Sequence, residues 1–135
     1  MAVKKLDEQV EELIDRWRLR LNLHEWRIDW DWVHGDMTFD AQTTSFFGQR
    51  RAHININDDC LGDRGRLRSA VVHELVHCRI AEMSDSVLNS GLQTALGETA
   101  WTIWYENWRR HMEMEVEALA VIFLGVWKDG DLKLT

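Results

Sequence analysis

The sequence predicts an α+β fold: an N-terminal helix, a small three-stranded antiparallel sheet, then a helix with an HExxH motif and C-terminal helices. Three observations support this. Apolar residues recur every three or four positions near the N-terminus, alternate with polar residues through the next segment, and return to helical spacing afterwards. The chain contains no proline, which favours long uninterrupted helices, and its 135 residues suit one domain over 1–135.

The N-terminal helix is predicted over residues 6–21, where the apolar side chains fall on one face. Alternating apolar and polar residues then predict three strands, at 26–32, 38–47 and 52–57. Gly35 and Asp36 predict the turn between the first two strands. Together the three strands are expected to form a small antiparallel sheet.

The remainder of the chain is predicted to be helical. Asp63 is the expected N-cap of a helix that ends near Met83, since residues 84–86 interrupt the pattern with two serines and an aspartate. A short helix is then expected to end near Leu96, followed by a last helix over 98–127. The polar residues 128–135 are predicted to fray.

Residues 73–77 read HELVH, an HExxH motif inside the first of these helices. His73 and His77 are four residues apart, so both imidazoles lie on one helix face and can reach one metal ion. Glu74 is offset by roughly 100° around the axis, where a base could take a proton from metal-bound water. Imidazole ligands suit zinc, so a zinc site with Glu74 as catalytic base is predicted.

A catalytic zinc takes three protein ligands, and the third is expected where several carboxylates enter the last apolar helix. Glu113 shares the apolar stripe of that helix and is predicted to point inward, where a carboxylate requires a cation. Glu113 is therefore the first candidate for the third ligand. Glu117, Glu115 and His111 remain alternatives.

The HELVH motif followed by EMEVEALA at 113–120 resembles the compact gluzincin-type metallopeptidases. Nearest in size and pattern are the ImmA/IrrE-like and SprT-like minimal zincins and the small metallopeptidases common in phage and prophage genomes. The resemblance implies a minimal zincin-like fold with Glu113 on zinc and Glu117 holding a ligand histidine. It places the strand at 52–57 at the substrate-lining edge, and SprT-like members, which use a third histidine, keep His111 as an alternative.

The expected function is a zinc-dependent metallopeptidase that hydrolyses a peptide or protein substrate with zinc-activated water and Glu74 as general base. Tyr105 and His53 are candidates for stabilising the oxyanion. Two other functions are weighed. One is a catalytically silent regulatory or binding protein that the metal stabilises, and the other is a SprT-like DNA-associated protease.

The formal net charge of −7 argues against a nucleic-acid surface. Arg64, Arg66 and Arg68 nevertheless offer a local basic patch, unless they pair with the nearby aspartates at 58, 59 and 63. The N-terminal residues contain no apolar signal region, and no run of 18 apolar residues occurs. An intracellular, cytoplasmic protein without a membrane span is therefore expected.

The chain has eight tryptophans, and six of them fall into two sets. Trp26, Trp30 and Trp32 lie in the first predicted strand, and another three lie at helical spacing in the last helix, at 101, 104 and 108. The two sets are expected to pack together and so clamp the sheet and the last helix around the HExxH helix.

Overall fold

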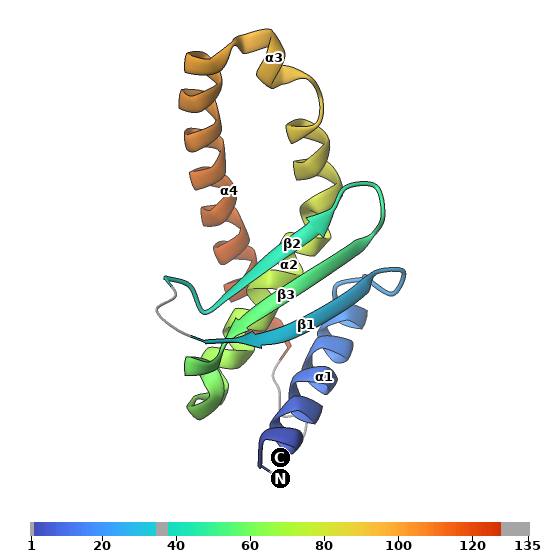
Figure 1. Ribbon diagram of the computed structural model, residues 1–135. Coiled ribbons are helices and arrows are strands. Elements are labelled where there is room, and N and C mark those ends of the chain that lie inside the picture. Colours follow the sequence, from blue (N-terminus) through green and yellow to red (C-terminus); the bar gives the residue numbers. More distant parts are fainter. Residues whose placement is uncertain (1, 35–37, 128–135) are drawn as a thin grey trace.

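The computed structural model describes residues 2–34 and 38–127 and has an α+β architecture (Figure 1). The predicted turn at Gly35 and Asp36 and the predicted frayed end at 128–135 lie outside the described residues. The elements in chain order are α1 (Ala2–Arg20), β1 (Arg27–Val33), β2 (Ala41–Phe46), β3 (Arg51–Asn57), the 3-10 turn η1 (Asp58–Gly62), α2 (Arg64–Leu88), α3 (Leu92–Leu96) and α4 (Glu98–Val126).

The sheet is mixed, so the expected antiparallel sheet is wrong. Its strand order is β1-β3-β2, with β2 antiparallel and β1 parallel to the central strand β3. A tight connection with positive φ at Gly48 (77°) and Arg50 (48°) joins β2 to β3. The chain also reverses direction between β1 and β2, but β1 pairs with the other side of β3 and not with β2. Alternation of apolar residues fixes which face a side chain takes, but it does not fix which strands are neighbours.

Helices cover one face of the sheet. Trp30 of β1 and Thr43 of β2 both pair with Ile54 of β3, so these three side chains share the covered face. The core between this face and the helices is fully buried. Its main members are Val10, Leu13 and Trp17 of α1, Ala52, Ile54 and Ile56 of β3, and Val71, Val72 and Leu75 of α2.

Two indole groups attach β1 to α1. Trp30 Nε1 donates a hydrogen bond to Glu11 Oε1 at 2.9 Å, and Trp32 Nε1 donates one to Asp7 Oδ1 at 2.6 Å. The two rings meet edge to face, with centroids 5.3 Å apart. The strand tryptophans therefore pack toward the N-terminal helix.

The helix α2 continues through the predicted interruption at residues 84–86 and ends at Leu88. Ser84 Oγ and Ser86 Oγ each donate to the backbone carbonyl three residues earlier, at 3.3 and 2.7 Å. Both hydroxyl groups therefore form their hydrogen bonds within the helix. Asp85 also accepts a hydrogen bond from Ser45 Oγ of β2 at 2.8 Å. This contact between distant residues stabilises a turn that local sequence alone disfavours.

The second half of α2, the short α3 and the first half of α4 form a helical hairpin that extends beyond the sheet (Figure 1). Trp104 of α4 stacks on Trp101 and on Trp108, with centroids 5.3 and 5.8 Å apart. In the described part of the chain, no ring contact joins this set to the strand tryptophans, so the predicted tryptophan clamp is wrong. No helix among residues 2–34 and 38–127 is long and apolar enough to cross a membrane.

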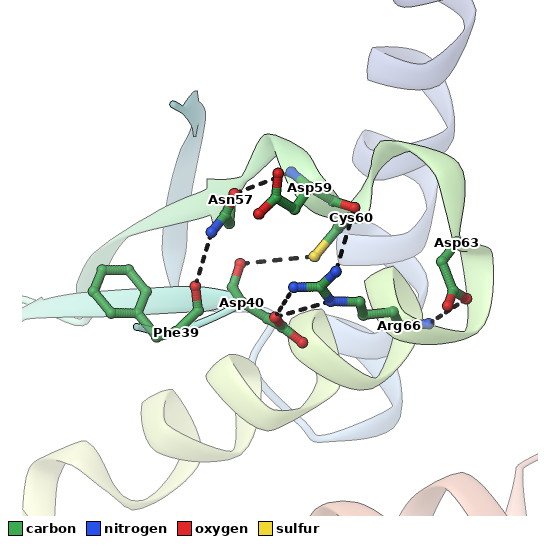
Figure 2. Close-up of polar contacts among 7 residues, drawn as sticks. All are labelled: Phe39, Asp40, Asn57, Asp59, Cys60, Asp63 and Arg66. Carbon is green, nitrogen blue, oxygen red and sulfur yellow. Dashed lines mark hydrogen bonds and ion pairs between the residues drawn. The ribbon is translucent and has the colours of Figure 1, made fainter. Parts of the chain in front are cut away.

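A polar cluster joins the start of β2 to the end of β3, to η1 and to the start of α2 (Figure 2). Arg66 donates to Asp40 Oδ1 from Nε at 2.9 Å and from Nη2 at 2.6 Å. Asp63 caps α2 by accepting from the Arg66 backbone N–H at 3.0 Å. Asn57 Nδ2 donates to the carbonyl of Phe39 at 3.2 Å. These bonds hold the beginning of β2 against α2, and they pair Arg66 with Asp40 instead of the aspartates near it in sequence.

Candidate metal centre

His73 and His77 lie on α2, with ring centroids 5.1 Å apart. The opposite side of this helix is held in the core by Val71, Val72 and Leu75, which are fully buried. Because the core fixes the rotation of α2, both imidazoles turn toward a groove, where each is partly buried. The helical spacing of the motif therefore produces the shared face that the sequence predicts.

Glu113 approaches both imidazoles from α4. Its Oε2 lies 3.2 Å from His73 Nε2, and its Oε1 lies 3.0 Å from His77 Nε2. Val116, one turn further along α4, is fully buried and sets this side of the helix toward α2. The three residues each offer a ligand atom, and these atoms lie within 4.8 Å of one another. Two imidazole nitrogens and one carboxylate oxygen form a donor set that fits a catalytic zinc.

Glu117 lies one turn after Glu113 and contacts the other nitrogen of His73. Its Oε2 is 2.7 Å from His73 Nδ1. An ionised carboxylate can only accept, so His73 donates from Nδ1 in this pair, and Nε2, which faces Glu113, is the nitrogen that would bind a metal ion. Glu117 thus orients a candidate ligand.

The two remaining candidates for the third ligand stand apart from the group. His111 Nδ1 lies 2.7 Å from the carbonyl of Asn107 on its own helix. Glu115 is exposed, and neither residue belongs to the group of possible metal-binding side chains in the described part of the chain.

Glu74 is buried beside the two histidines, with only 8% of its side chain exposed. Its Oε1 accepts a hydrogen bond from Thr43 Oγ1 of β2 at 2.8 Å, and its Oε2 lies 3.9 Å from His73 Nε2. Burial raises the pKa of Glu74 to about 7, although the hydrogen bond from Thr43 opposes this shift. The carboxyl group can therefore exchange a proton near neutral pH.

His77 has a lowered pKa, chiefly because burial disfavours the imidazolium form, while the nearby Glu113 carboxylate opposes the shift. A lowered pKa keeps the imidazole neutral at neutral pH. The neutral form is the one that binds metal ions.

The candidate metal centre lies in a cavity of about 670 Å³ between β2, α2 and α4. The strand along this cavity is β2, an edge strand, whereas β3 is central in the sheet. The expectation that the strand at 52–57 lines the substrate edge is therefore wrong. Strand order causes the difference, because β2 lies outside β3 and faces α2 through Thr43.

The two residues proposed for the oxyanion do not line this cavity. His53 of β3 pairs with Thr44 of β2, so both side chains lie on the sheet face opposite Thr43. The Nε2 atom of His53 lies 3.2 Å from Asp31 Oδ2. Tyr105 stacks instead on Trp101, with centroids 5.6 Å apart.

Sequence reasoning missed two residues that line the cavity, Thr43 and Arg109. Arg109 lies one turn before Glu113 and contacts Glu106 Oε2 at 3.1 Å. Its position four residues before a candidate ligand was the available signal. Thr43 carried no comparable signal, because its role depends on which strand borders α2.

No protein-family model, curated protein or solved structure matches this chain.

Proposed function

We propose that the protein is a zinc-dependent metallopeptidase of the HExxH, gluzincin-like type. One observation carries this proposal: ligand atoms of His73, His77 and Glu113 converge within 4.8 Å, with the buried carboxyl group of Glu74 beside them. Three protein ligands leave a position for water, which is the arrangement of catalytic zinc sites. Zinc, when bound, would supply a Lewis acid that activates water and polarises a peptide carbonyl.

The residues around the site divide the remaining work. Thr43 donates a hydrogen bond to Oε1 of Glu74. The other oxygen, Oε2, lies 3.9 Å from His73 Nε2 and is the atom that accepts a proton from water. The same carboxyl group then returns the proton to the leaving amine. Glu117 orients the imidazole of His73 by accepting a hydrogen bond from Nδ1.

The cavity favours an extended peptide as substrate. The edge strand β2 forms one wall, and a peptide beside it could add main-chain hydrogen bonds to the sheet. Arg109 lines the same cavity and provides a positive charge that would stabilise the oxyanion.

The test begins with metal content. We expect purified protein to hold one zinc per chain by mass spectrometry, and His77→Ala and Glu113→Ala to lose most of it. Cleavage of an unstructured protein such as casein, or of a mixed peptide library, measures activity. Glu74→Gln should keep zinc yet lose at least about 100-fold in rate, because only the proton acceptor is removed.

The same experiment separates the other two functions. A metal-stabilised binding protein would hold zinc and melt at lower temperature without it, but would cleave nothing. A DNA-associated protease would bind DNA in a salt-dependent way. Internal contacts of two basic residues do not favour it: Arg66 pairs with Asp40, and Arg68 Nη2 donates to the carbonyls of Leu124 and Trp127 at 3.3 and 3.0 Å.

A further inference from the structure

The outer face of α4 carries a concentration of exposed apolar side chains. Five of the nine large hydrophobic residues exposed in the described part of the chain lie on this helix, each between 57% and 69% exposed. They are Ile103, Met114, Val121, Ile122 and Val126. Most of them line a wide, mainly apolar groove formed by α4, with His73 of α2 at its edge. Contiguous apolar surface of this kind marks an interaction site.

The outer face follows the spacing of a helix-pairing surface. Residues 100, 103, 107, 110, 114, 117 and 121 alternate steps of three and four along α4. The first, second, fifth and last are apolar: Ala100, Ile103, Met114 and Val121. These seven residues, called here the outer stripe, are all exposed, whereas Val116 and Ala120 pack into the core. Glu117 lies at the edge of the stripe, where it also contacts His73. The outer stripe can therefore receive a second helix without disturbing the fold.

Charge along the outer stripe indicates what that second helix is. The charged residues that line the groove before Met112 are Glu106, Arg109 and Arg110, with one net positive charge. Those after Met112 are Glu113 and Glu117, which carry two negative charges, contact the histidines on α2 and remain 47% and 63% exposed. A parallel copy would bring like charges together, whereas an antiparallel copy brings the basic half against the acidic half. The stripe is thus complementary to itself in one orientation only.

The apolar positions agree with the same orientation. Ile103 and Val121 lie nine residues before and nine after Met112. A two-fold axis level with Met112 therefore places Ile103 of each copy opposite Val121 of the other, and it places Asn107 opposite Glu117. From the charge pattern and this symmetry, we propose that α4 pairs antiparallel with α4 of a second copy to form a homodimer.

Sedimentation equilibrium on wild type over a wide concentration range tests the association. We expect twice the chain mass of 15.9 kDa at the upper concentrations. Met114→Glu and Val121→Glu should each raise the dissociation constant at least about tenfold, because each places a carboxylate in the apolar contact. Leu19→Glu is the matched control, since Leu19 is an equally exposed apolar residue on α1, and it should leave the dimer unchanged. A wild type that stays monomeric overturns the proposal, and so does a dimer that both α4 variants leave intact.

Disulfide trapping tests the orientation. Antiparallel pairing brings position 103 of one copy against 121 of the other, so Ile103→Cys/Val121→Cys should give covalent dimers on mild oxidation. In that arrangement two copies of position 103 are about 27 Å apart along the helices, so Ile103→Cys alone should not crosslink. The native thiols of Cys60 and Cys78 are buried and should not contribute. If Ile103→Cys alone gives covalent dimers and the double variant gives no more of them, the helices pair in parallel and the proposal is wrong.

Discussion

The two halves of α4 have different environments although they belong to one continuous helix. The first half, residues 98–111, contains no buried residue, and its tryptophans stack mainly on one another. The second half holds the two buried residues of the helix, Val116 and Ala120. Glu113 lies where one half gives way to the other. The difference shows that the fully buried packing next to the candidate ligand lies on its C-terminal side.

The largest expected effect is a difference in the unfolding free energy that is lost when a residue is substituted in each half of α4. Val116→Asp should lower the free energy of unfolding by about 3 kcal/mol or more, because it buries an unpaired carboxylate. Trp108→Asp removes a larger side chain but should cost only about 1 kcal/mol, since that residue is partly exposed in the first half. Urea denaturation measures both. Equal losses would mean that the two halves are equally packed.

A metal ion should tie α2 to α4 near the point where the two halves of α4 meet. At a free zinc concentration about 100 times the dissociation constant, wild type should gain about 2.7 kcal/mol in unfolding free energy. Glu113→Ala should lose most of this gain, and Glu115→Ala, whose side chain points elsewhere, should keep it. Hydrogen exchange provides a local readout. Zinc should increase amide protection in residues 98–112 of wild type, and unchanged protection there would argue against a bridging ion.

A smaller effect is expected at Glu117, which contacts Nδ1 of His73. Glu117→Gln keeps the shape of the side chain but removes the charge that accepts from His73 Nδ1. Zinc affinity, measured by competition with a chelator, should fall about 10- to 100-fold. Glu115→Gln is the matched control and should bind zinc as wild type does. If both variants behave alike, Glu117 does not orient His73.

The smallest effect concerns thiol reactivity. Burial raises the pKa of Cys60, and it raises the pKa of Cys78 to about 12, so neither thiol should react with a disulfide reagent at pH 8 in the native state. Thr102→Cys, on the exposed first half of α4, should react within minutes. Rapid labelling of the native cysteines would show that the packed region opens more readily than its burial suggests.

Local features of the fold could be predicted from the sequence, and features set by distant contacts could not. Four-residue spacing placed His73 and His77 on one helix face, and the apolar stripe turned Glu113 toward them. The order of the strands depends on pairing between distant segments, which alternation does not encode. This is why the strand beside Glu74 and the role of Thr43 were missed.

The predicted end of α2 failed for a related reason. Ser84 and Ser86 weaken a helix by propensity, yet Ser45 of β2 holds Asp85 between them. Tertiary contacts of this kind override weak local preferences. The tryptophan clamp was wrong because six large rings were assigned to one core, whereas Trp104 stacks on Trp101 and Trp108 within the first half of α4.

The helical hairpin formed by α2, α3 and α4 also bears on how an ion would be captured. His77 and Glu113 are far apart in sequence, and joining such positions in a flexible chain carries a loop-closure entropy that grows with the length between them. Here the carboxylate already lies 3.0 Å from the imidazole. The loop-closure entropy is therefore lost when the hairpin folds and not when an ion binds. Binding then requires only that the side chains adjust, with no change in the path of the backbone.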